Sequence, residues 1–203
     1  MRLAAILSLI IALFIAAPVQ AAGEEQQAGA FVDNVLSQAI GTIKQTRSGQ
    51  LSQNNAKVKF RQILNNAFDV PTIARFTLGR YWRVATPDQR AEHARLIKTA
   101  ILDKYADRVL SYSGSGYKID KSAAINERDY AVTALIDREQ GAPVNFGWRL
   151  RKTGNSFKVI DLSVEGISMS VTHQSDFASI IERNGGRVES LLAALRNKDL
   201  PAH

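Results

Sequence analysis

The 203-residue sequence contains no cysteine, which excludes disulfides, thiolate metal sites, a cysteine nucleophile and a thioester-linked lipid anchor. Histidine is also scarce: there are three, and one of them is the last residue. Few ligands are therefore present for a histidine-based metal centre. With 22% charged residues and 13 glycines, the composition is that of a globular domain, neither disordered nor fibrous.

The longest apolar run lies at the N-terminus. Arg2 precedes an apolar stretch at residues 3–17, Pro18 ends it, and Val19 and Ala21 supply the small residues of a cleavage site. The run is shorter than the roughly 20 residues that span a bilayer, so an uncleaved anchor helix fits less well than a secretory signal. We predict a signal peptide at 1–21, followed by a flexible leader at 22–29.

Removal of the signal peptide leaves 25 Lys+Arg against 19 Asp+Glu, a net charge of +6. An exported, basic domain without disulfides is typical of a bacterial periplasm, and we predict a periplasmic location. The charge suits an anionic membrane or an acidic protein. The basic residues are dispersed along the chain, and together with the export signal this argues against nucleic acid as a partner.

Apolar residues at spacings of three and four predict helices over 32–43 and 56–67. A third, short helix is expected between Asp69 and Gly79. A fourth is expected from Thr86, where Thr, Pro and Gln follow the pattern of a helix start, to about Leu110.

The spacing then changes to strict alternation, which predicts four antiparallel strands near 117–119, 130–136, 144–150 and 159–164. Two further helices follow, over 175–183 and 188–195. We predict an α+β fold, with N-terminal helices, a four-stranded antiparallel meander sheet and C-terminal helices. One domain spans 30–198, and a tail occupies 199–203.

Catalytic signals are weak. His93 falls among charged residues of the fourth helix, so we expect it at the surface. His173, Ser175 and Asp176 are too close in sequence to form a triad, because such residues cannot reach one another in the required geometry. The sequence also lacks metal-ligand spacings, a dinucleotide fingerprint and an ATPase motif. We predict no enzyme activity, no cofactor and no metal. The apolar surplus then fits either a closed core or a pocket for an apolar ligand.

Two stretches carry a family resemblance. FDVPTIARFTLGRYWR at 68–83, followed by TPDQRAEHARLI at 86–97, resembles the periplasmic phospholipid-shuttle proteins called MlaC or toluene-tolerance proteins. The segment VIDLSVEGISMSVTHQSDFASIIERNGGRVESLLAALRNK at 159–198 resembles the closing part of that family. In place of an aromatic-Arg pair common in the family, this chain has His173 and Gln174.

The resemblance implies a soluble periplasmic carrier that moves phospholipid between the inner and outer membranes. Its implied partners are an inner-membrane ABC transporter with a substrate-binding ring and an outer-membrane lipoprotein complex. Alternatives are a carrier of another apolar lipid such as a hopanoid, an exported non-metal enzyme acting on a small apolar substrate, and an interaction domain with a closed core.

A carrier of this kind needs an apolar pocket between the sheet and the helices. One wall is expected from the alternating strands and the others from the helices and the last strand end. The candidates are Val132, Phe146, Trp148, Leu162 and Val164 for the sheet, and Phe76, Leu78, Ile97, Ile101, Tyr105, Ile167, Met169, Phe177 and Ile181 for the other walls.

Overall fold

The computed structural model describes residues 19–110 and 116–199, with side chains described over 23–100 and 116–199. Helices precede and follow an antiparallel sheet, as expected for an α+β fold. The helices are α1 Val19–Arg47, α2 Gln53–Ala67, α3 Val70–Leu78, the short 3-10 helix η1 Gly79–Trp82, α4 Pro87–Leu110, α5 Met169–Arg183 and α6 Val188–Asn197.

The sheet is an antiparallel meander in which each strand pairs with the next along the chain. Its strands are β1 Tyr117–Ala124, β2 Asp129–Ile136, β3 Val144–Thr153, β4 Ser156–Val164 and β5 Ile167–Ser168. The sequence predicts four strands, and the structure has five. The additional strand, β5, is only two residues long, too short to show an alternating pattern, and it pairs with the end of β4.

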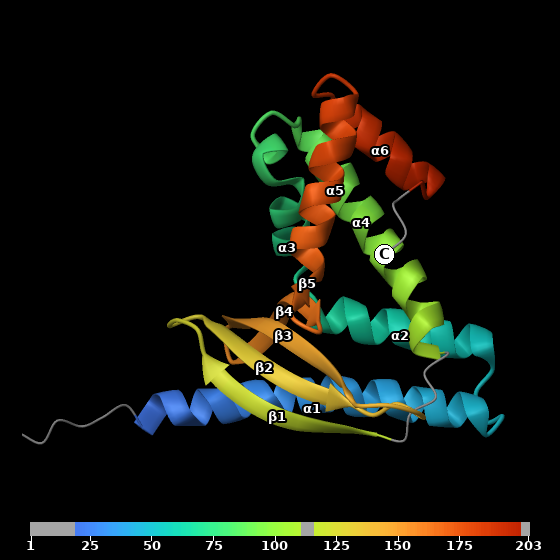
Figure 1. Cartoon of the computed structure of the whole chain (residues 1–203), viewed down its shortest axis with the longest axis vertical. Coiled ribbons are helices and arrows are strands. Elements are labelled where there is room, and N and C mark those ends of the chain that lie inside the picture. The colour runs from blue at the N-terminus through green and yellow to red at the C-terminus, as the bar shows by residue number, and fades with distance from the viewer. Residues whose placement is uncertain (1–18, 111–115, 200–203) are drawn as a thin grey trace, which may run out of the picture.

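The molecule divides into two parts (Figure 1). In the first, α1 runs along one face of the sheet and α2 lies beside α1; we call α1, α2 and β1–β5 the sheet layer. In the second, α3, η1, α4, α5 and α6 pack together beyond the β4–β5 end of the sheet; we call these the helical lobe. Each part has its own cluster of buried apolar side chains.

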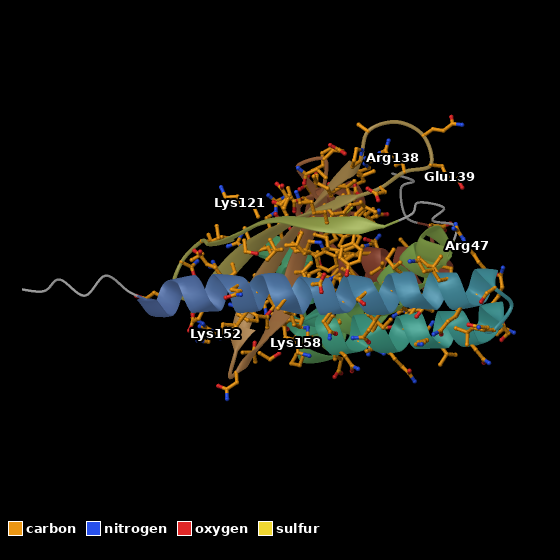
Figure 2. All side chains as sticks on the ribbon, turned by 90° about the horizontal axis from the view of Figure 1, so that it is seen from below. Arg47, Lys121, Arg138, Glu139, Lys152 and Lys158 are labelled. Carbon is orange, nitrogen blue, oxygen red and sulfur yellow. The ribbon has the colours of Figure 1, made fainter. Side chains whose placement is uncertain are left out.

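The N-terminal part of α1 differs from the sequence-based expectation of a flexible leader at 22–29. These residues are helical, and Ala28 is fully buried against the sheet. The Glu24 carboxylate accepts hydrogen bonds from the Tyr130 hydroxyl and the Lys152 ammonium group (Lys152 is labelled in Figure 2). The small and polar residues become helical because strands about 100 residues later supply these contacts, which the local sequence does not reveal.

Helix starts follow the expected capping chemistry where the signal is local. At the start of α4, the backbone N–H of Gln89 donates to Thr86 Oγ1 (3.2 Å), and the Thr86 N–H donates to Gln89 Oε1 (3.1 Å). The predicted start of α5 near Ser175 is wrong. Helix α5 begins at Met169 with Ser168 as its cap, because the Ser168 hydroxyl accepts from the Val171 N–H (3.1 Å) directly after β5.

The two edges of the sheet differ in structure. Strand β1 lies at one end of the strand order, and its pairing with β2 shifts register between Ile119 and Lys121. At the other edge, β4 is covered by β5 and by a bridge from Phe68, with the Asp69 N–H donating to the Val159 carbonyl (2.9 Å). This bridge ties the start of the helical lobe to the sheet.

Candidate functional site

The sheet face that packs against α1 and α2, called the inner face, carries the predicted sheet wall. Trp148 on β3 lies opposite Val132 of β2 and Leu162 of β4. Val132 and Trp148 are buried, at 1% and 6% exposure. Leu162 is only half-buried, whereas Phe157 and Val159 earlier on β4 are buried, so the covering of the inner face thins toward the end of β4.

The inner face is least covered at the start of β3. Phe146 lies opposite Val164 of β4, and both side chains are half-buried. Phe146 packs against the sheet-layer core, as does Leu162. Together with Trp148, these residues form an apolar surface that is closed at one end and partly open at the other. We call Phe146, Trp148, Leu162 and Val164 the open end of the inner face.

The predicted helix wall is placed differently. Four of the candidates lie deep in the core of the helical lobe and are at most 1% exposed: Leu78, Ile97, Phe177 and Ile181. They pack with one another and with α6, in a cluster distinct from that of the sheet layer. Among the side chains that the structure describes, Phe68 is the one half-buried residue that packs against both clusters.

The remaining candidates lie at the surface or beyond the described side chains. Phe76 and Ile167 are exposed, at 44% and 62%, and Met169 is half-buried at the start of α5. Ile101 and Tyr105 fall in the second half of α4, whose side chains lie outside the described part of the chain. The predicted lining residues are thus divided between two cores, the surface and α4.

One polar atom stands out on the inner face. The indole Nε1 of Trp148 is shielded from solvent and has no hydrogen-bond partner among the described residues. Buried indole N–H groups ordinarily find an acceptor. Sequence alternation places Trp148 in the apolar row, but it contains no signal for whether the N–H is paired.

The opposite, outer face of the sheet is polar. A hollow of about 290 Å³ lies over it, lined largely by outward residues of β2, β3 and β4 that include Thr133, Gly147 and Ser163. Nearby, the buried Asp129 carboxylate pairs with Arg149 (3.2 Å) and Arg151 (2.8 Å). Hydrogen bonding from Arg151 lowers the pKa of Asp129, with a smaller effect of Arg149. This face provides charged and polar groups rather than a dry slot.

His93 corrects a second sequence-based expectation, because it is fully buried and not at the surface. Its Nε2 lies 3.2 Å from Thr77 Oγ1, and its ring meets Phe177 edge-on at 5.6 Å. Burial lowers the pKa of His93 to about 4. The helical spacing to Leu96 and Ile97 was the available signal that His93 faces the core.

The residues considered for catalysis do not gather into a charged centre that could hold a metal. His173 stacks on Phe177 within α5, with ring centroids 5.6 Å apart. Across residues 19–110 and 116–199, no three His, Asp or Glu side chains are grouped so that they could hold a metal ion. Over the same ranges, none of the helices has the length and apolarity needed to cross a membrane.

Comparisons with known proteins find the same family that the sequence motifs at 68–97 and 159–198 resemble. The toluene tolerance protein ttg2D of Pseudomonas putida is 23% identical over 163 residues, which cover 79% of this chain and 76% of that protein. A phospholipid-binding protein from Ralstonia solanacearum, solved in complex with a phospholipid, has the same fold, with a TM-score of 0.73 and 24% identity over 85% of this chain and 97% of that one. The family of MlaC proteins matches residues 33–197, which include the helical lobe and all of the sheet layer except the first half of α1. The chain therefore belongs to the MlaC family.

Proposed function

We propose that this protein is a non-enzymatic phospholipid carrier. The observation that carries the proposal is the family match across both parts of the fold, supported by a relative of the same fold whose structure holds a phospholipid. A diacyl phospholipid has roughly 30 methylenes, and exposing each to water costs about 0.8 kcal/mol. Unaided transfer through water is therefore very slow, and a protein that shields the tails removes most of this cost.

The open end of the inner face is the proposed site for the acyl chains. Phe146, Leu162 and Val164 are apolar yet only half-buried, so a ligand that covers them gains apolar contact without displacing a packed core. Trp148 and Val132 would form the floor. Met169, Ile101 and Tyr105 are proposed for the facing wall, whereas Phe76 and Ile167 are proposed for the rim.

The helical lobe has a different role in this proposal. Its buried candidates Leu78, Ile97, Phe177 and Ile181 already contact one another and α6. Opening that cluster to admit a lipid would expose apolar side chains. We assign these four residues to the support of the site rather than to its lining.

The proposed setting is the periplasm, reached through the signal peptide at 1–21. There the carrier would move phospholipid between the inner and outer membranes as the soluble binding component of an ABC-type system. The sequence contains no P-loop motif, so the energy for directed transport would come from partners. These would be an inner-membrane transporter with a substrate-binding ring and an outer-membrane lipoprotein complex.

Organic extraction of the purified protein, followed by mass spectrometry, tests the carrier function. We expect about one phospholipid per protein. Trp148→Arg would place a charge in the proposed floor and should abolish lipid recovery. Val84→Arg adds the same charge at a side chain that is 69% exposed in the connection between η1 and α4, and it should retain lipid.

Circular dichroism of both variants separates loss of lipid from loss of fold. Wild-type protein that carries no lipid, and takes up none from phospholipid vesicles, contradicts the carrier function. Recovery of a hopanoid instead would identify the protein as a carrier of another lipid class.

The partner proposal is tested separately by chemical crosslinking in intact cells and affinity purification. We expect crosslinks to an inner-membrane transporter component and to an outer-membrane lipoprotein. Crosslinks confined to soluble proteins would contradict the shuttle between membranes while leaving lipid binding itself intact.

A further inference from the structure

The indole N–H of Trp148 is a polar group on the apolar face that we propose for lipid binding. The backbone of Trp148 is paired on both sides, with β2 through Val132 and with β4 through Leu162. Its side chain is 6% exposed, and its neighbours along the same face include Phe146, which is half-buried. The indole therefore lies where the closed part of the inner face passes into its open end.

The Trp148 N–H is the only polar group that this indole has, and it cannot accept a hydrogen bond. It lies among hydrocarbon side chains, and the described residues offer it no acceptor. Leaving a donor unpaired in such a place is unfavourable, whereas Phe would fill much of the same space without that cost. An indole here is explained if a ligand brings an acceptor to it.

The surroundings restrict what that acceptor can be. Val132, Leu162 and Phe146 present only carbon and hydrogen. The pair of Asp129 with Arg149 lies on the outer face, and the pair of Lys152 with Glu24 lies toward the end of β3, four residues beyond Trp148. A phosphate would lose its hydration here without gaining a compensating positive charge. An ester carbonyl is neutral, accepts a hydrogen bond and stands at the root of an acyl chain, so it can reach an apolar surface together with that chain.

We propose that the Trp148 indole N–H donates a hydrogen bond to an acyl-ester carbonyl of the bound lipid, and so makes the site selective for ester-linked lipids over hydrocarbon-rich or ether-linked ones. This inference rests on the proposed carrier function. It assigns Trp148 a role in specificity, distinct from its contribution to the apolar floor.

A competition between matched lipids tests the inference. Vesicles are made from equal amounts of dioleoyl phosphatidylethanolamine and its di-O-oleyl ether analogue, which differ only in the two carbonyl groups. After incubation and reisolation of the protein, mass spectrometry gives the ratio of ester to ether lipid bound. One neutral hydrogen bond predicts a wild-type preference for the ester of roughly three- to tenfold.

Trp148→Phe should lower this ratio to about one, because the aromatic floor remains and the donor is removed. The control is Trp82→Phe, the same change at the other tryptophan of the sequence, where the ring lies in the helical lobe 5.4 Å from the Arg90 guanidinium carbon. That variant should keep the wild-type ratio. Because a ratio is measured on lipid-loaded protein, moderate changes in stability do not affect it.

A second measurement needs no variant. In wild-type protein loaded with the ester lipid, the proton NMR signal of the Trp148 indole N–H should move downfield and exchange more slowly than in protein loaded with the ether lipid. A wild-type ratio of one, an unchanged ratio in Trp148→Phe, or identical indole signals with both lipids overturns the inference. Binding of neither lipid would instead refute the carrier function on which it rests.

Discussion

The two parts of the molecule bury their apolar residues in different ways. The helical lobe closes its core completely around Phe177, Leu191 and Leu192, which are at most 1% exposed. The sheet layer covers Val132 and Leu150 equally well but leaves Phe146 and Leu162 half-buried. The molecule thus contains one core that is fully covered and one apolar surface that is partly uncovered. In the proposed function, the lobe therefore supports the site, and the open end of the inner face binds the lipid.

Phe177→Ala should give the largest effect, because it removes a fully buried ring that contacts both His93 and His173. Truncating such a ring costs about 3–5 kcal/mol of unfolding free energy. Urea unfolding followed by circular dichroism measures the loss. The variant that remains folded at low temperature should still bind lipid at wild-type stoichiometry. Lost binding with unchanged stability would reverse the roles assigned to the two parts.

Acidification should give the second-largest effect, by lowering the stability of the helical lobe. The pKa of His93 is lowered to about 4 in the folded protein, whereas in the unfolded chain it lies near 6.5. The unfolded state therefore binds a proton first as pH falls, so the stability contributed by neutral His93 is complete above pH 6.5 and is lost toward pH 4. The full change is about 3 kcal/mol by linkage.

Unfolding free energies measured between pH 8 and pH 4 check this prediction. His93→Gln should flatten the decline below pH 6.5, whereas above pH 7 both proteins should show the same slope. An equally steep decline in the variant would show that other groups cause the acid sensitivity.

Phe146→Ala should have the smallest effect on stability, about 1–2 kcal/mol, because a half-buried side chain loses less contact than a buried one. Its effect on lipid uptake from vesicles should be larger than that of Phe177→Ala, since Phe146 belongs to the open end of the inner face. The matched comparison uses the same Phe-to-Ala change in both parts. Equal lipid uptake by the two variants would remove the distinction between them.

The sequence reveals features whose causes are local. The Thr86–Gln89 start of α4, the end of α3 at Gly79 and the alternating strands all appear as expected, because capping groups and side-chain periodicity are set by neighbouring residues. Features that depend on contacts between residues distant in sequence are harder to predict from the sequence. The helical state of 22–29 depends on Tyr130 and Lys152, and β5 depends on its pairing with the end of β4.

The candidate site shows the same limit. Alternation correctly places Val132 and Trp148 on an apolar face, but it cannot distinguish the half-buried Leu162 from a closed core. Nor can it tell that Leu78 and Ile97 pack in a separate cluster, because that separation depends on how α3 and α4 meet α5 and α6. The unpaired Trp148 N–H emerges only when all surrounding groups are placed.

The irregular edge strand β1 has a consequence for how other proteins can approach. An exposed, regular strand edge invites another chain to add a strand through backbone hydrogen bonds. Here β1 shifts register between Ile119 and Lys121 and carries the charged residues Lys118, Asp120 and Lys121, while the opposite edge is occupied by β5 and Phe68. Neither edge is thus a regular, unpaired strand, and this disfavours the addition of a strand from another chain. We therefore expect a partner to recognise side chains rather than extend the sheet.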